Sequence, residues 1–136
     1  MNREDPFSGR WKLNPEKSNL DPNHRPSSAT MHWERTSEGY RMTAEGVKGD
    51  GNVVKERPAT FILDGKDHAV PDSPGLCAAM SRPTLNAIEV VTKYAGSVVG
   101  NASYVVSGDE ATLIASVSGI DAQQQPFETM AVFDRL

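Results

Sequence analysis

The chain has 136 residues, the size of one domain, and we expect a single domain over residues 1–136. Its 14 lysines and arginines are outnumbered by 18 acidic residues and are scattered along the sequence, so nucleic acid and anionic membranes are poor candidates as partners. No apolar run approaches the roughly 20 residues of a membrane span, and the charged N-terminus lacks the apolar core of a secretory signal. We therefore expect a cytoplasmic protein, or an exported one if a leader has been trimmed.

The first apolar alternation contains Gly9 and Trp11 in a G-x-W spacing. A strand that places a large aromatic ring against the closed end of a barrel needs an inward tryptophan and, close to it, a residue without a side chain where backbones crowd. Asn14 is then predicted to cap a short turn that Pro15 begins. The N-terminal segment is therefore typical of a strand that closes a small β-barrel.

Three long segments follow that predict half-buried strands. Residues 28–36 and 40–45 alternate between apolar and polar side chains and are joined by a turn at 37–39. A third strand is expected from 53 to 63, broken or bulged near Pro58, because proline donates no ladder hydrogen bond. The apolar faces of these segments hold Ala29, Met31, Trp33, Tyr40, Met42, Ala44, Phe61 and Leu63.

The second half of the chain is predicted as a series of hairpins after one irregular region. Residues 71–83 contain three prolines, and we expect a loop with a brief extended or helical piece about Cys77, whose thiol should be buried and structural. Strands are expected at 85–94, 97–107, 111–119 and 127–134, with Ala95-Gly96 as a tight turn. Turns are also expected at 48–52, 64–67 and 121–126.

These elements favour an all-β fold. Strands joined by short turns, without βαβ alternation, predict an antiparallel up-and-down β-barrel of eight to ten strands, because pairing the first strand with the last removes the exposed edges. A two-sheet sandwich is the alternative, although its Greek-key crossings require longer connections.

The segment Phe7-Ser8-Gly9-Arg10-Trp11-Lys12-Leu13-Asn14 resembles the G-x-W opening of the lipocalins and the F-x-G-x-W-K-L opening of the fatty-acid-binding proteins, two families of calycin barrels. With D-G-K-D at 64–67 and D-A-Q-Q-Q-P at 121–126, the chain is similar to a group of small bacterial lipocalin-like proteins of unassigned role. The resemblance covers most of the chain and implies a calycin β-barrel. Its motifs are turn and closure elements, so they imply little about chemistry.

The resemblance also implies contacts and exclusions. In lipocalins an arginine near the end of the barrel packs over the G-x-W tryptophan, which implies that Arg135 lies over Trp11. The chain departs from both families, because Cys77 has no disulfide partner, no long helix follows the last strands, and the Arg and Tyr pair that holds a fatty-acid carboxylate is missing. A fatty acid is therefore not a favoured ligand.

Residues that commonly carry catalysis or bind metals form no recognised motif. The histidines His24, His32 and His68 have no second ligand at a metal-binding spacing, so we expect no metal and no cofactor. His32 should face solvent, and His68 is either at a barrel mouth or a loop residue without a role. No nucleophile elbow, phosphate loop or H-E-x-x-H is present, and we assign no catalytic residue. We expect the strand glutamates on solvated faces, namely Glu34, Glu45, Glu56, Glu89 and Glu128.

Large aromatic residues and a methionine on the strands form the candidate ligand-binding set, which is Trp33, Tyr40, Met42, Phe61 and Tyr104. Small residues between them favour a cavity for a small hydrophobic or aromatic molecule. One alternative is a cofactor-independent isomerase, cyclase or hydratase in the same cavity, which needs an inward His or Glu near a Tyr. Another is a solid barrel that acts as a protein-interaction domain. The sequence leaves a homo-oligomer open.

Overall fold

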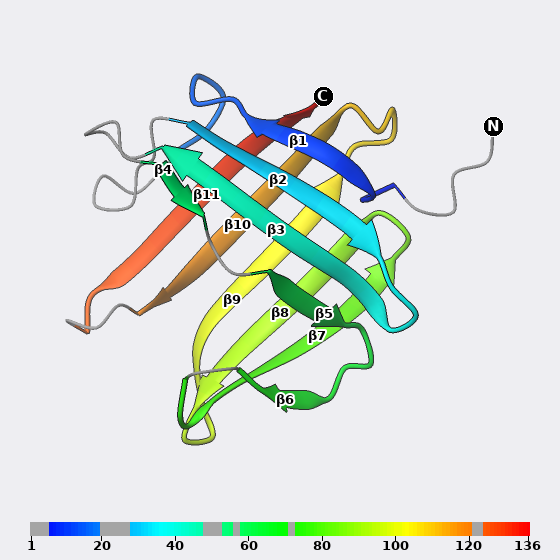
Figure 1. Cartoon of the computed structure of the whole chain (residues 1–136). Coiled ribbons are helices and arrows are strands. Elements are labelled where there is room, and N and C mark those ends of the chain that lie inside the picture. Colours follow the sequence, from blue (N-terminus) through cyan, green and yellow to red (C-terminus); the bar gives the residue numbers. More distant parts are fainter. Residues whose placement is uncertain (1–5, 20–27, 48–52, 56–57, 71–72, 121–123) are drawn as a thin grey trace.

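The computed structural model describes residues 6–19, 28–47, 53–55, 58–70, 73–120 and 124–136. These residues form one antiparallel sheet of eleven strands that curves into a barrel (Figure 1). Outside the described residues lie His24, Glu56, the turn predicted at 48–52 and the first half of the turn predicted at 121–126.

The strands follow one another around the barrel in nearly the order of the sequence. They are β1 (Gly9–Leu13), β2 (Ser28–Arg35), β3 (Gly39–Val47), β4 (Val53–Lys55), β5 (Ala59–Ile62), β6 (Asp67–Ala69), β7 (Leu76–Thr84), β8 (Ala87–Tyr94), β9 (Ser97–Val106), β10 (Thr112–Ile120) and β11 (Pro126–Arg135). The spatial order is β4-β3-β2-β1-β11-β10-β9-β8-β7-β6, and β5 pairs with β3 beside β4. The first strand pairs with the last, so the predicted up-and-down barrel is confirmed.

The barrel is left open along one side. Strand β5 pairs with β3 and strand β6 pairs with β7, but β5 and β6 do not pair with each other. The turn between them crosses this side, where the Leu63 N–H donates to the Glu38 carbonyl (3.1 Å) and the Gly65 N–H to the Met80 carbonyl (2.8 Å). The prediction that closure removes every edge is wrong here, because each of these short strands pairs on one side only.

The predicted faces of the first long strands are confirmed. Met31 and Trp33 of β2 and Tyr40 of β3 are buried, while His32 lies on the opposite face of β2 and keeps 41% of its side chain exposed. The break expected near Pro58 is also present, because β4 and β5 pair with β3 on either side of it. Two-residue alternation therefore identified which side chains enter the barrel.

The prediction of an irregular loop at 71–83 is wrong, because most of this segment belongs to the nine-residue strand β7. Pro83 lies in the register shift between Ser81 and Thr84, where the ladder with β8 is irregular and a missing N–H removes no regular bond. Cys77 is paired in register with Ala69 and Lys93 and is half-buried, so the prediction of a buried thiol is also wrong.

The two ends of the chain are held together by Arg135 over Trp11, as the resemblance implied. The guanidinium carbon lies 4.1 Å from the centre of the buried indole. Arg135 also donates to the carbonyls of Pro6 (2.6 Å), Ser8 (2.9 Å) and Glu110 (2.7 Å). A Cβ on Gly9 would lie 2.7 Å from Nη1 of Arg135, and Gly9 has φ +130°, which explains the glycine of the G-x-W spacing.

Candidate ligand-binding site

An aromatic cluster inside the barrel brings together four of the five predicted site residues. Trp33 of β2 lies at its centre, with its ring centroid 5.0 Å from that of Phe61, 5.4 Å from Tyr104 and 5.7 Å from Tyr40. The rings of Phe61 and Tyr104 are 5.7 Å apart and nearly perpendicular. Such tilted and edge-to-face pairs are the favoured geometry for aromatic rings and stabilise the cluster beyond simple area burial.

Within this set the exposure differs from residue to residue. Trp33, Tyr40 and Phe61 are at most 3% exposed, so they pack as part of the core. Tyr104 and Met42 are half-buried and pack against that core. Met42 is the register partner of Trp33 on one side and of Ala59 on the other. The buried rings therefore form a floor, and Tyr104 and Met42 are the members at its accessible edge.

Two members of the cluster were missed by the sequence reasoning. Phe7 is fully buried, with its ring 5.3 Å from Trp33 and 5.6 Å from Tyr40. The Arg82 guanidinium lies 5.5 Å from the Tyr40 ring and 5.7 Å from the Phe7 ring and donates to the Leu85 carbonyl. Arg82 was missed because it falls in the segment predicted as a loop. A cation therefore covers this end of the cluster.

The floor contains one unsatisfied polar atom. Nε1 of Trp33 is buried and has no hydrogen-bond partner among the described residues. An unpaired buried donor costs about 1–3 kcal/mol, and buried polar groups without partners are rare in native structures. Trp11 differs, because its Nε1 donates to the Phe7 carbonyl at 3.0 Å.

Burial of the inward side chains falls along the strands from one end of the barrel to the other. On β9, β10 and β11 the inward positions form rows across the sheet, as the register shows. The first row is buried and consists of Val106, Leu113 and Phe133. The last row is half-buried and consists of Gly100, Gly119 and Phe127. The same change occurs from Trp33 to Ala29 on β2 and from Tyr40 to Ala44 on β3.

This gradient shows that the barrel is filled at one end and accessible at the other. Inward side chains reach solvent through the mouth of the barrel or through its open side, so the half-buried inward residues keep surface that packing does not cover. Several of these residues are small, among them Ala29, Ala44, Gly100 and Ala102. Barrels of this size either fill their interior with side chains or hold one small ligand, and here the small inward residues lie at the half-buried end.

A hollow lies at the open side of the barrel, between β5 and the strands β6 and β7. Its volume is about 280 Å³, and its walls are mainly apolar, with Ala59 and Ile62 from β5 and Ala78 and Met80 from β7. His68 of β6 also lines it and is the register partner of the inward-facing Ala78. We call this hollow the side pocket. The position of His68 fits the barrel-mouth alternative rather than that of a loop residue.

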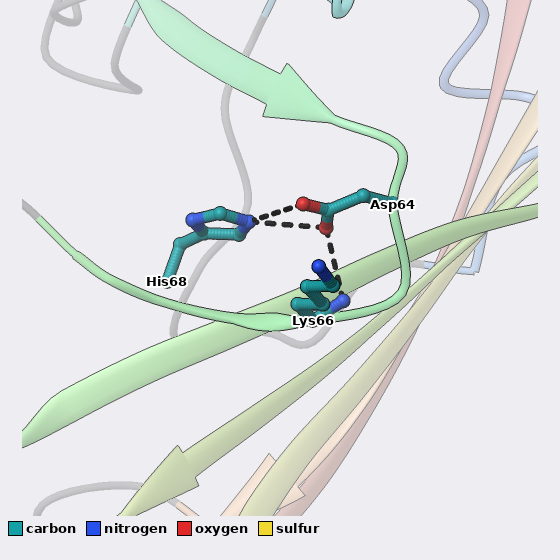
Figure 2. Close-up of polar contacts among 3 residues, drawn as sticks. All are labelled: Asp64, Lys66 and His68. Carbon is teal, nitrogen blue, oxygen red and sulfur yellow. Dashed lines mark hydrogen bonds and ion pairs between the residues drawn. The ribbon is translucent and has the colours of Figure 1, made fainter.

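His68 is held by a carboxylate (Figure 2). Its Nε2 lies 3.0 Å from both Oδ1 and Oδ2 of Asp64, and the Lys66 N–H donates to Oδ1 at 2.9 Å. The Lys66 hydrogen bond, and after it the His68 hydrogen bond and charge, lower the pKa of Asp64 below its ordinary value. Sequence reasoning treated 64–67 as a turn only. The signal for the pair was an aspartate at the start of a D-G turn with a histidine four residues later.

The strand glutamates that the structure describes lie away from the interior. Glu34, Glu45, Glu89 and Glu128 are exposed, as predicted. In the described ranges no three His, Cys, Asp or Glu side chains gather to hold a metal ion. Nor does the described part of the chain contain a helix long and apolar enough to cross a membrane.

The fold is shared with two solved ligand-binding proteins. Zebrafish ileal bile acid-binding protein, solved with cholic acid, superposes with a TM-score of 0.59 at 13% identity, over 97% of this chain and 100% of that protein. As-p18, an extracellular fatty acid binding protein, superposes with a TM-score of 0.57 at 12% identity, over 97% of each chain. No protein-family model and no curated protein sequence matches this chain. The chain thus has the same antiparallel up-and-down β-barrel fold as these two proteins.

Proposed function

We propose that this protein binds a small hydrophobic or aromatic molecule in the accessible part of its barrel interior. The observation that carries the proposal is the fall in burial along the inward positions, from packed aromatic rings to half-buried small residues. The names of the two structural neighbours, a bile acid-binding and a fatty acid binding protein, support the same general use of the fold. The accessible interior also argues against the alternative of a solid barrel.

In this proposal the five predicted residues have two roles. Tyr104 and Met42 contact the ligand directly, because they keep exposed surface beside the cluster. Trp33, Tyr40 and Phe61 form the floor below it. The enzyme alternative requires an inward His or Glu near a Tyr. The four described strand glutamates face solvent, and no tyrosine is among the described residues that line the side pocket with His68, so neither observation supports this alternative. The narrower resemblance to bacterial lipocalin-like proteins, the cytoplasmic location and a homo-oligomer stay predictions.

Filling the interior tests the proposal. Ala102 is a half-buried inward residue of β9 between Val90 and Val117, so Ala102→Phe should place a ring where the ligand lies. With 1-anilinonaphthalene-8-sulfonate as a fluorescent apolar probe, we expect the variant to bind about tenfold more weakly or not at all. Asn101→Phe is the matched control, because Asn101 is the adjacent, exposed residue of the same strand.

The result depends on both variants being folded, which thermal unfolding followed by circular dichroism establishes. A wild-type protein that does not bind the probe, or equal binding by the inward and outward variants, would contradict the proposal. Weaker binding by Ala102→Phe alone would support an interior site.

A further inference from the structure

We infer that the side pocket between β5 and β7 holds the polar end of the ligand, and that this ligand is an apolar molecule carrying a hydroxyl group that donates to Nδ1 of His68. The inference rests on the proposed function and adds a ligand class and an orientation to it.

The side pocket is continuous with the wall of the barrel. Ala78 is buried in the core cluster, and Met80 and Ala59 pack against that cluster, yet all three also line the pocket. A molecule in the pocket therefore contacts side chains that also pack against the core of the barrel. At about 280 Å³ the pocket is at the small end of ligand sites, which suits one ring or a short branched group.

His68 is the side chain that we expect to determine which polar group of a ligand the pocket binds. An ionised carboxylate only accepts hydrogen bonds, so the Asp64 oxygens 3.0 Å from Nε2 require the proton on that nitrogen. The hydroxyl therefore binds the neutral form of the imidazole, in which the other nitrogen, Nδ1, has a free lone pair and is an acceptor. Figure 2 shows this second ring nitrogen on the side of the ring away from Asp64.

The acceptor selects among polar groups. A hydroxyl donates to Nδ1, whereas a carboxylate offers no proton near neutral pH and would also be repelled by ionised Asp64. Hydrogen bonds from a ligand to a placed polar group fix its orientation within a mainly apolar site. Alcohols and phenols therefore fit this pocket better than fatty acids do.

Hydrogen bonds of the turn at 64–66 and of strand β6 to the neighbouring strands hold His68 in place. Asp64 accepts from the Lys66 N–H, and the neighbouring Gly65 N–H donates to the carbonyl of Met80, a pocket residue. Strand β6 is tied to β8 by the Lys93 ammonium, which donates to Asp67 at 3.3 Å. The turn, the pair and the pocket wall therefore form one connected unit.

A matched pair of probes tests the hydroxyl preference. Fluorescence titrations with 2-naphthol and with naphthalene compare two bicyclic molecules that differ by one hydroxyl. We expect the wild-type protein to bind 2-naphthol about five- to tenfold more tightly, the range of one net hydrogen bond. His68→Leu should remove this preference, so that 2-naphthol and naphthalene bind the variant within about twofold of each other.

Two further variants make the result specific. His32→Leu removes the histidine on the outer face of β2, which also has a carboxylate nearby, Glu34 at 3.4 Å, and it should keep the full preference. Asp64→Ala leaves His68 in place without its partner and should reduce the preference in part.

The outcomes separate the two proposals. Equal binding of both probes by the wild-type protein, or a preference that survives in His68→Leu, would overturn the role of the side pocket and leave the interior site standing. Failure of the wild-type protein to bind either probe would count against both.

Discussion

At the scale of single residues, the stability of this barrel depends on one arginine near the end of the chain. Arg135 covers the buried ring of Trp11 and donates to three backbone carbonyls, two of which belong to residues before β1. Gly9 leaves the space that this guanidinium occupies. The G-x-W spacing therefore records a contact between the two ends of the sequence.

Arg135→Lys should show how much this contact contributes. A lysine keeps the charge but cannot reach three carbonyls with a planar fork, so we expect the free energy of unfolding to fall by about 2–3 kcal/mol. Urea denaturation measures the change. Arg10→Lys is the control, since Arg10 is an exposed neighbour on β1 and should change stability by less than about 0.5 kcal/mol. A similar loss of unfolding free energy in the two variants would show that the contacts of Arg135 do not stabilise the barrel more than those of an exposed arginine.

At the scale of elements, the turn of the hairpin between β8 and β9 places Ala95 in a left-handed backbone conformation that alanine rarely adopts. Ala95 and Gly96 form the predicted tight turn with φ of 50° and 85°, the left-handed pair of a type I′ turn. Asparagine tolerates this region better than alanine, so Ala95→Asn should raise the free energy of unfolding by about 0.5–1 kcal/mol, measured by thermal or urea unfolding.

Gly96→Ala is the opposing control for this hairpin. It places a Cβ at φ 85° although no atom lies within 4 Å of that Cβ, so a loss of stability would come from the backbone alone. Stabilisation by this change, or destabilisation by Ala95→Asn, would mean that the turn has another conformation.

Elements with a local signal were predictable from the sequence. Alternation placed Met31, Trp33 and Tyr40 inside, because the pleat of a strand sends neighbouring side chains to opposite faces. The turn at 95–96 followed from its short length between two apolar runs, and the break at Pro58 followed from the missing N–H.

Elements that depend on distant pairing were not predictable. Strand β7 was missed because prolines usually interrupt strands, and only its register shift explains how Pro83 is accommodated. The open side was missed because alternation indicates which face is buried and not which edges pair. The pair of Asp64 and His68 was missed because only the pairing of β6 with β7 places His68 beside the pocket that β5 and β7 form.

At the scale of the whole molecule, the barrel combines a firmly paired half with a lightly paired side. Strand β10 pairs along most of its length with β9 and along all of it with β11. The four-residue β5 and the three-residue β6 each pair with one strand only. Segments with few backbone hydrogen bonds open at lower free-energy cost than the core of the sheet. We therefore expect the barrel to open more easily beside the side pocket than at β10 and β11.

Native-state hydrogen exchange should detect this difference. We expect the paired amides of β5 and β6 to exchange about 100-fold faster than those of β10 and β11, because their local opening costs about 3 kcal/mol less. Saturating 2-naphthol should slow exchange in β5, β6 and the turn between them more than in β10, because ligand contact at the side pocket stabilises the closed form of those strands. Uniform protection across the sheet would indicate that the barrel opens only as a whole, and that the two short strands do not control access to the side pocket.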